Sequence, residues 1–305
     1  TEFTTEANPG TVMPEHLTVW QQMGINRVSL GLQSAQNREL QMLGRIHSYE
    51  EFLTTYQMIR QSGMDQINID VMAAIPEQTL ESYQDTLEKI VSLNPEHISS
   101  YSLIIEPGTV FGDWEKNGTL KHVDEDVDRQ MYEWTGKYLQ HMGYQRYEIS
   151  NYCRDGMECR HNCVYWSGGE YLGLGINASS YLTGYRFHVP VSQKTYRSYV
   201  DRICVLDEKE SEGLKKAVQE MNELEFIDQR AQIEEFMFLG LRMMAGVSEQ
   251  EFYQRFGISM MEVYGDIIKK YQNMDLLCRR DTGRVALTEK GIDVSNSILS
   301  DFLLN

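Results

Sequence analysis

The first half of the chain alternates short extended segments with amphipathic helical ones, and this alternation restricts the folds it can adopt. Alternating polarity and β-branched residues predict strands at residues 1–6, 25–31, 66–72 and 97–103. Helical spacing of apolar residues predicts crossover helices between them, at residues 48–60 and 79–93. This order predicts an α/β fold with a parallel sheet or barrel, with functional residues at the carboxyl ends of the strands.

Polar residues lie within or just after these predicted strands, ahead of turns that contain Pro or Gly. They are Glu6, Gln33, Asp70 and Glu106. A turn or a helix cap explains each one taken alone. Because the carboxyl ends of parallel strands meet at one edge, the four together also indicate the mouth of a barrel. Asp70 is the hardest to explain as a turn residue, because a charge within an apolar strand needs a partner.

Composition and charge argue against several classes of protein. The 305 residues carry a formal net charge of −17, which repels nucleic-acid phosphate, so we expect no nucleic-acid partner. No apolar run approaches the roughly 20 residues that span a bilayer, so we do not expect an integral membrane protein. Residues 1–30 lack the pattern of a secretory signal, and the five cysteines are an odd number. We therefore expect reduced thiols and a cytoplasmic protein.

The segment CRDGMECRHNCVYW, residues 153–166, holds three of the five cysteines. Thiolates beside an imidazole are ligands for metal ions and for haem iron. A metal site here would use Cys153, Cys159, His161 and Cys163. A haem-contacting motif would instead use His161, Tyr165 and Trp166. The spacing C-x5-C-x-H-x-C lacks the close cysteine pair of most structural zinc sites, which disfavours the metal site.

We expect three parts along the chain. They are residues 1–200 with the sheet and the cysteine-rich segment, a connector at residues 201–227, and a separate unit at residues 228–305. The last part is predicted to hold three helices, a hairpin and a closing helix, at residues 234–244, from 248, 260–273, 276–287 and after 288. This is the order of a winged-helix domain. Its third helix carries two acids and only two lysines, so we expect a structural or docking role rather than DNA binding.

Several strings occur in an order that is specific to one family. They are EANPGT (6–11), GINRVSLGLQS (24–34), LGRIHS (43–48), INIDVMAAIPEQTLES (67–82), YSLIIEPGT (101–109), GYQRYEISNY (143–152), HNCVYW (161–166) and YLGLG (171–175). Across nearly its whole length the chain resembles the radical S-adenosylmethionine (radical SAM) proteins related to oxygen-independent coproporphyrinogen III oxidase. It looks most like the HemW branch, whose members are regarded as haem chaperones and in which HNxxYW is associated with haem binding.

The resemblance implies a partial (β/α)6 radical-SAM barrel followed by a winged-helix-like C-terminal domain. It also implies the residues that contact S-adenosylmethionine, namely Glu6, Gln33, Arg45 and Asp70. Their chemistry agrees, because carboxylates accept from an amino group and ribose hydroxyls, and a guanidinium suits a carboxylate. For haem it implies His161 as the ligand of the iron, with Tyr165 and Trp166 packed on the porphyrin.

The chain departs from the family pattern at three places. The C-x3-C-x2-C loop that holds a 4Fe-4S cluster is absent, as is the GGxPS-type segment after the next strand. We therefore expect an N-terminally truncated protein that lacks the first two βα units, about 60 residues. NASS (177–180) replaces a common GAHS string, and Glu77 replaces a common glycine after Pro76, which should change only a turn.

Truncation has two expected consequences. The full-length protein would bind the 4Fe-4S cluster and S-adenosylmethionine, whereas this chain should bind neither well. Its exposed sheet edge should promote aggregation, because an unpaired strand is a template for other strands.

Three functions compete. The HNCVYW string favours a haem-binding chaperone that carries haem to an acceptor protein of unknown identity. The alternative is an enzyme, oxygen-independent coproporphyrinogen III oxidase, which forms protoporphyrinogen IX by oxidative decarboxylation, and the sequence leaves open whether the protein is an enzyme. A winged-helix regulator that binds DNA is disfavoured by the acidic third helix.

Overall fold

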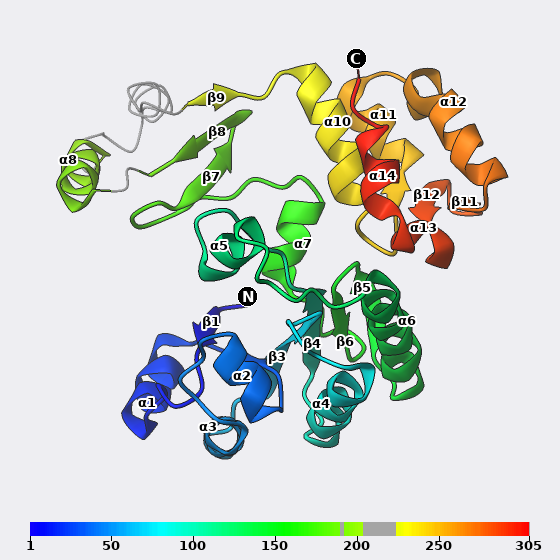
Figure 1. The fold of residues 1–305 in the computed structure, drawn as a ribbon. Helices are drawn as coiled ribbons and strands as arrows, with labels where there is room; N and C mark the ends of the chain where they lie inside the picture. The colour runs from blue at the N-terminus through cyan, green and yellow to red at the C-terminus, as the bar shows by residue number, and fades with distance from the viewer. Residues whose placement is uncertain (190–191, 204–223, 305) are drawn as a thin grey trace. The chain divides into compact units, whose positions relative to one another are not determined.

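The structure is a computed structural model that describes residues 1–189, 192–203 and 224–304 (Figure 1). The chain forms two compact units, residues 1–160 and residues 161–305. The boundaries that we expect at residues 200 and 228 stay predictions, and most of the expected connector at 201–227 lies outside the described residues.

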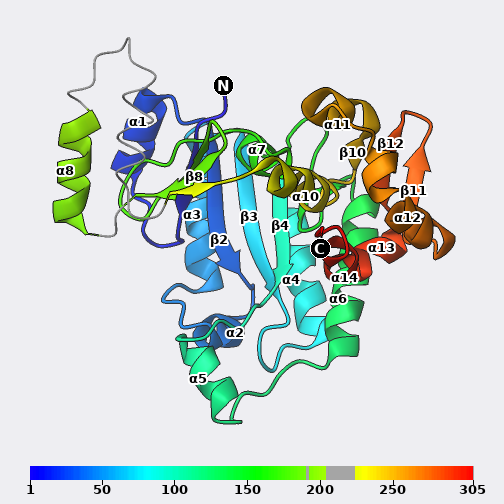
Figure 2. The same ribbon diagram turned by 90° about the horizontal axis from the view of Figure 1, so that it is seen from above.

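The first unit is built on one sheet with the strand order β1-β2-β3-β4-β6-β5 (Figures 1 and 2). The strands are β1 (Thr4–Ala7), β2 (Arg27–Gln33), β3 (Gln66–Ala73), β4 (His97–Ser102), β5 (Gln145–Glu148) and β6 (Asn151–Cys153). β1 to β4 are parallel neighbours, and β6 pairs antiparallel with both β4 and β5. The predicted parallel α/β sheet is therefore confirmed.

The first two strands begin two to three residues later than predicted, at Thr4 and Arg27. The Asn26 side chain explains this difference. It accepts from the N–H of Phe3 at 2.8 Å and donates to the carbonyl of Thr1 at 2.9 Å. These side-chain bonds, together with two backbone bonds to the carbonyl of Phe3, hold this end outside the regular strand pairing. β1 is an edge strand, and the expected aggregation through a sheet edge stays a prediction.

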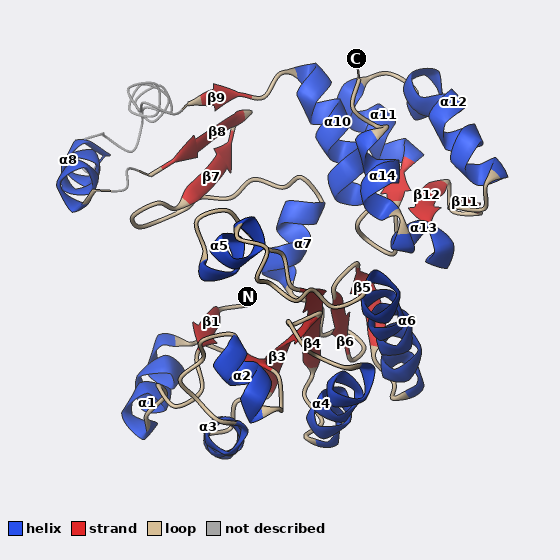
Figure 3. Ribbon diagram, viewed as in Figure 1, coloured by secondary structure: helices blue, strands red, loops and turns tan. Residues whose placement is uncertain are grey.

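Helices connect these strands and cover the sheet, as the colouring by secondary structure shows (Figure 3). They are α1 (Pro14–Met23), α2 (Asn37–Met42), α3 (Tyr49–Gln61), α4 (Leu80–Ser92), α5 (Val110–Lys116) and α6 (Glu125–His141). A capping box opens α3, because Ser48 and Glu51 each accept from the other's backbone N–H. Thr79 and Ser82 form the same arrangement at the start of α4.

The two faces of the sheet have opposite character, because successive residues of a strand point to opposite sides. One face is apolar and forms a single core with side chains of α3, α4 and α6. The residues of that face include Val28, Leu30, Ile67, Ile69 and Ile98, none more than 1% exposed. Burial of this whole core is the main apolar contribution to the folding of this unit, at about 25 cal/mol for each Å² of apolar surface.

The opposite face is polar over its middle strands. It carries the alternate residues, Arg27 and Ser29 of β2, Asn68 and Asp70 of β3, and His97, Ser99 and Tyr101 of β4. Asp70 therefore does not interrupt an apolar strand, because its polar neighbours share its face while Ile69 and Val71 face the core. This polar face positions the candidate site.

The second unit begins with the cysteine-rich helix α7 (Arg160–Trp166), whose first residue closes the first unit. A small antiparallel sheet follows in the order β7-β8-β9. Its strands are β7 (Ser179–Leu182), β8 (Tyr185–His188) and β9 (Glu225–Phe226), and α8 (Gln193–Ile203) follows β8.

The C-terminal part of the second unit has the predicted order of helices and hairpin. Its elements are α10 (Gln229–Gly240), β10 (Val247–Ser248), α11 (Glu249–Phe256), α12 (Met260–Asn273), β11 (Leu277–Arg280), β12 (Arg284–Leu287), α13 (Glu289–Asp293) and α14 (Ser295–Ser300). The helix predicted at 234–244 instead begins at Gln229, because Asp228 caps it by accepting from the N–H of Ala231. The predicted closing helix is two short helices, α13 and α14.

No helix within the described ranges is both long enough and apolar enough to cross a membrane.

Candidate functional site

Asp70 is the most constrained of the predicted cofactor residues. Its carboxylate accepts from Asn68 Nδ2 at 2.7 Å and from Ser29 Oγ at 3.2 Å. Burial raises the pKa of Asp70 above its usual value, and the nearby carboxylate of Glu6 adds to the rise. Among the described residues no cation pairs with Asp70, and each carboxylate oxygen can accept from a further donor. Asp70 is therefore a fixed acceptor rather than half of a structural salt bridge.

Gln33 ends β2 in a conformation that its residue type rarely adopts. Its φ of 74° lies in the left-handed region, and the register with β3 shifts between Gly31 and Gln33. The side chain is buried, and its Oε1 accepts from the hydroxyl of Tyr101 at 3.1 Å. Backbone strain of this kind persists only where the surroundings hold it, and it is concentrated at functional sites.

Tyr101 on β4 marks the place where the predicted cofactor residues meet. Burial, and next the charge of Asp70, raise the pKa of Tyr101 to about 12. The charge of Arg45 lowers that pKa, and the charge of Glu6 raises it. Charges act with this strength only over short distances. Tyr101 therefore contacts Gln33 directly and lies within the electrostatic range of Asp70, Arg45 and Glu6.

Arg45 follows α2 and points to an amide rather than to a carboxylate. Its Nη1 donates to Asn8 Oδ1 at 3.0 Å. The same Asn8 oxygen lies 3.6 Å from where a Cβ on Gly31 would be, and Gln33 Nε2 lies 3.1 Å from that point. A Cβ at Gly31 would therefore be tight against the Gln33 amide, which would have to shift by a few tenths of an ångström.

Asn8, Ser29, Asn68 and Tyr101 complete the site, and the sequence analysis gave none of them a role. The signal that identifies three of them is the period of two along each strand. Ser29 precedes Gly31 by two positions, Asn68 precedes Asp70 by two, and Tyr101 follows His97 by four, so each lies on the polar face. Asn8 lies in a turn, where no such period exists.

The donors and acceptors gathered here suit a small molecule with an amino group, hydroxyls and a carboxylate. Two carboxylates and the Gln33 amide oxygen accept, and Arg45 donates to an anion. The same residues do not suit an iron–sulfur cluster, which is held by cysteine thiolates. The sequence has no C-x3-C-x2-C loop, and the described residues contain no group of three His, Cys, Asp or Glu that could hold a metal ion.

The cysteine-rich segment is not gathered around one point. Cys153 ends β6, Cys159 is buried with its Sγ 3.7 Å from Glu2 Oε1, and Cys163 lies on α7. Cys153, Cys159 and Cys163 form no disulfide. They also belong to no metal-binding group within the described ranges. The structure therefore gives no support to a metal site made of these cysteines and His161.

His161 and Tyr165 lie four positions apart, on one side of α7. The Tyr165 hydroxyl is 3.0 Å from His161 Nε2, and the two rings meet edge to face with centroids 4.9 Å apart. Tyr165 also meets Tyr171 edge to face at 4.6 Å. The His161 side chain is exposed, so its imidazole is accessible to a large ligand.

Trp166 faces the C-terminal part of its own unit. The guanidinium of Arg242, which follows α10, stacks on the indole at 4.3 Å from the ring centroid. The indole Nε1 is buried and has no hydrogen-bond partner among the described residues. The structure therefore places His161 and Tyr165 together and directs Trp166 towards Arg242.

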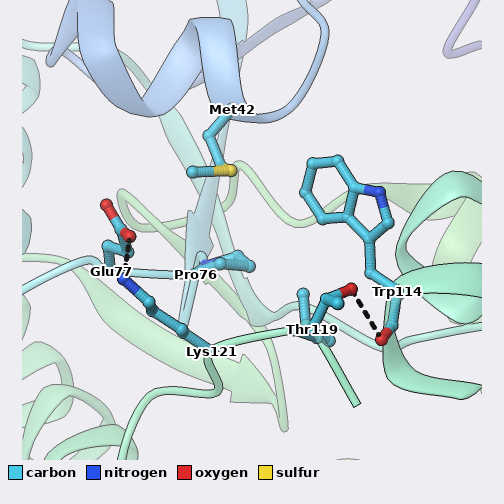
Figure 4. Close-up of a pocket in the computed structure, with 7 residues that line it drawn as sticks. Met42, Pro76, Glu77, Trp114, Thr119 and Lys121 are labelled. Carbon is cyan, nitrogen blue, oxygen red and sulfur yellow. Dashed lines mark hydrogen bonds and ion pairs between the residues drawn. The ribbon is translucent and has the colours of Figure 1, made fainter. Parts of the chain in front are cut away.

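A surface pocket of about 310 Å³ lies beyond the carboxyl end of β3 (Figure 4). Met42, Pro76 and Trp114 form apolar walls, and an ion pair of 3.2 Å between Glu77 and Lys121 forms another. The residues predicted to contact S-adenosylmethionine do not line it. The pocket is therefore separate from the cofactor residues.

The backbone conformation of Glu77 fits the glycine that the sequence resemblance leads us to expect at this position. Its φ of 65° is in the left-handed region, which glycine adopts without strain. The side chain forms ion pairs with Arg38 and Lys121, which offset part of that strain. The turn is therefore kept despite the substitution.

The chain is similar to known proteins in two regions and over its whole length. Residues 1–90 match the radical SAM superfamily, and residues 227–294 match the HemN C-terminal domain. The chain is 36% identical over 306 residues to the heme chaperone HemW of Lactococcus lactis, which covers 100% of this chain and 76% of that protein. It is 33% identical over 302 residues to the heme chaperone HemW of Bacillus subtilis, and this alignment covers 99% of this chain and 76% of that protein.

A solved structure, coproporphyrinogen III oxidase (HemN) from Escherichia coli, described as a radical SAM enzyme, matches with a TM-score of 0.77. The match covers 99% of this chain and 69% of that one at 18% identity, so it shows the fold alone. The expected radical-SAM fold with a C-terminal HemN-type domain is confirmed. With identities of this size over its whole length, the chain belongs to the HemW family of radical S-adenosylmethionine proteins.

Proposed function

We propose that this chain binds haem through His161 and delivers it to an acceptor protein in the cytoplasm. The observation that carries the proposal is the exposed imidazole of His161 at the start of α7. A neutral imidazole is a common ligand of haem iron. The names of the relatives, heme chaperone HemW, support the same function. Haem is here the cargo of the protein.

The aromatic residues of α7 take different parts in this proposal. Tyr165 lies against His161 and offers a ring edge to the porphyrin. Trp166 stacks with Arg242 and fixes α7 on the C-terminal part of its unit. We propose that Trp166 supports the porphyrin site mainly through this packing.

S-adenosylmethionine is the second proposed ligand, held around Tyr101. Because the residues predicted to contact it are present, we propose that this chain binds it, in place of the poor binding that the missing cluster loop leads us to expect. Asp70 and Glu6 accept from its amino group and ribose hydroxyls, and Arg45 binds its carboxylate. Gln33, held by the hydroxyl of Tyr101, can both donate and accept. When bound, the molecule supplies a sulfonium whose substituents can be transferred or cleaved. The sequence lacks the C-x3-C-x2-C loop that holds a 4Fe-4S cluster, so no step is assigned to the cluster.

A haem titration followed by Soret absorbance tests the haem site. We expect His161→Ala to weaken haem binding at least about tenfold and to shift the Soret maximum, because the iron loses its ligand. His188→Ala is the matched control, since His188 is also exposed and lies in the same unit. Equal affinities for the parent, His161→Ala and His188→Ala would remove His161 as the ligand.

The alternative is the oxidative decarboxylation of coproporphyrinogen III. It rests on the likeness to HemN, which shows the fold alone at 18% identity. Formation of protoporphyrinogen IX by the full-length, cluster-reconstituted protein would favour the oxidase over haem delivery.

A further inference from the structure

A line of hydrogen bonds crosses the polar face of the first unit and starts at Asp70. Asn68 Nδ2 donates to Asp70 Oδ1 at 2.7 Å, and Asn68 Oδ1 lies 2.5 Å from His97 Nδ1. On its other side, His97 Nε2 lies 2.9 Å from the hydroxyl of Tyr147. The backbone N–H of Cys159 donates to that hydroxyl at 3.3 Å. Asn68, His97 and Tyr147 are at most 8% exposed, so the line is shielded from water.

The surroundings of Asn68 fix the direction of these bonds. Its amide nitrogen donates to Ser29 Oγ at 2.8 Å as well as to Asp70, so its oxygen must accept. That oxygen accepts from Ser99 Oγ at 3.1 Å and from His97 Nδ1. The amide of Asn68 thus has all four of its hydrogen bonds, and His97 must carry its proton on Nδ1.

His97 keeps this direction because it stays neutral. Burial holds the pKa of His97 well below its usual value, and the charge of Arg27 lowers it further. With a proton on Nδ1, the Nε2 atom is an acceptor, and the Tyr147 hydroxyl donates to it. The Tyr147 oxygen then remains the acceptor for Cys159 N–H. Each group in the line therefore has one defined role.

The far end of the line is the start of the helix that carries the proposed haem ligand. Cys159 and Arg160 directly precede His161, and the N–H of Arg160 donates to Glu2 Oε2 at 2.9 Å. The line thus joins the carboxylate proposed to bind S-adenosylmethionine to the backbone at the first turn of α7.

We propose that Asn68, His97 and Tyr147 are positioning residues that orient Asp70 and couple occupancy of the S-adenosylmethionine site to haem binding on α7. This rests on the proposed function. A ligand that donates to Asp70 Oδ1 shares that oxygen with Asn68 Nδ2 and so changes the hydrogen bond between Asn68 and Asp70. Because Asn68 has no spare hydrogen bond, any shift of its amide is passed to His97 and Tyr147, and so to Cys159. Coupling between two sites acts equally in both directions.

The test is the haem affinity of the whole chain with and without saturating S-adenosylmethionine. We expect the two dissociation constants of the parent to differ by about fivefold or more, the lower end of typical coupling. Tyr147→Phe keeps the ring and removes the hydroxyl, so the ratio should fall to about one. Tyr83→Phe is the matched control, because Tyr83 is fully buried in the same unit and its hydroxyl lies 2.7 Å from Ser100 and from Thr135.

His97→Asn separates positioning from coupling. Its amide can still donate to Asn68 from near the place of Nδ1, but it does not reach Tyr147. We expect this variant to keep the affinity for S-adenosylmethionine, measured by equilibrium dialysis, and to lose the effect on haem affinity. A large loss of S-adenosylmethionine affinity in His97→Asn would contradict the proposed division of roles.

The outcomes distinguish this inference from the function on which it rests. If the parent binds both ligands and its haem dissociation constant is the same with and without S-adenosylmethionine, the coupling is wrong and haem binding stands. A ratio that falls equally in Tyr147→Phe and Tyr83→Phe, or in neither, also overturns the coupling. Failure of the parent to bind haem or S-adenosylmethionine contradicts the proposed function itself.

Discussion

The cofactor residues and the haem helix differ in how the chain brings their side chains together. Glu6, Gln33 and Asp70 come from three neighbouring parallel strands, and Arg45 comes from the loop after α2. His161 and Tyr165 lie four positions apart on α7 and meet through helical spacing alone. In the first group Gln33, Arg45 and Asp70 are each held by hydrogen bonds to different neighbours, whereas the second group lies on one short helix. Changes in either region should therefore affect different ligands.

Trp166→Ala should have the largest effect, because the position of α7 depends on few contacts. Loss of the stacking on Arg242 should destabilise the protein by about 3 kcal/mol, at the low end for tryptophan because Trp166 is only partly buried. Thermal unfolding measures this change. Trp114→Ala is the control, since Trp114 is 38% exposed on α5 and should cost much less. Equal losses in the two variants would show that Trp166 does not anchor α7.

Asp70→Asn should weaken S-adenosylmethionine binding by about 30-fold, the value of a hydrogen bond to a charged group. Haem affinity without S-adenosylmethionine should stay within twofold of the parent, because α7 keeps its own contacts. Equilibrium dialysis and a Soret titration measure the two affinities. Asp65→Asn, at an exposed position just before β3, is the control. A variant Asp70→Asn with parental S-adenosylmethionine affinity would separate Asp70 from the cofactor site.

The raised pKa of Asp70 also predicts how binding depends on pH. The folded protein holds this proton more tightly than the unfolded chain does, so folding stability from Asp70 increases as pH falls towards the raised pKa. Binding of a donor by the ionised carboxylate is lost over the same range, which lies above the usual value of 3.8. As pH is lowered, the affinity of the parent for S-adenosylmethionine should therefore begin to fall at a higher pH than it would with an aspartate of ordinary pKa. A midpoint at or below 3.8 would contradict the burial of this group.

Tyr165→Phe should strengthen haem binding by about fivefold, because the Tyr165 hydroxyl occupies His161 Nε2 in the free protein and haem iron must displace it. A Soret titration measures this gain. Tyr253→Phe, an exposed position of the same unit, should leave the affinity unchanged. Weaker binding in Tyr165→Phe would mean that the hydroxyl supports haem rather than competing with it.

Glu77→Gly should have the smallest effect, on folding stability rather than on either ligand. Glycine at a φ of 65° removes strain worth about 1 kcal/mol, and the loss of two exposed ion pairs costs a similar amount at most. We expect the free energy of unfolding to change by less than about 1 kcal/mol, measured by urea denaturation. Glu115→Gly is the comparison, because Glu115 lies within helix α5 and glycine there should only destabilise. A larger change in the free energy of unfolding of Glu77→Gly would show that this turn stabilises the fold more than its contacts account for.

Much of the fold was predictable from the sequence, because helix caps and the period of two are local signals. Ser48 with Glu51 gave the start of α3, and alternation gave the parallel strands. The start of α10 was not predictable from apolar spacing, because the cap on Asp228 decides it. The role of Tyr101 was also missed, since its contact with Gln33 depends on a bulge and a left-handed residue 68 positions away. Trp166 was expected on the porphyrin, and no sequence pattern indicated its packing on Arg242.

The most direct test of haem binding through His161 is chemical rescue. His161→Gly leaves space where the imidazole was, and free imidazole can then bind the iron. We predict that His161→Gly loses the Soret spectrum of the haem-bound parent and that added imidazole restores it. A parental spectrum in His161→Gly without imidazole would contradict the account, because the iron would then have another ligand.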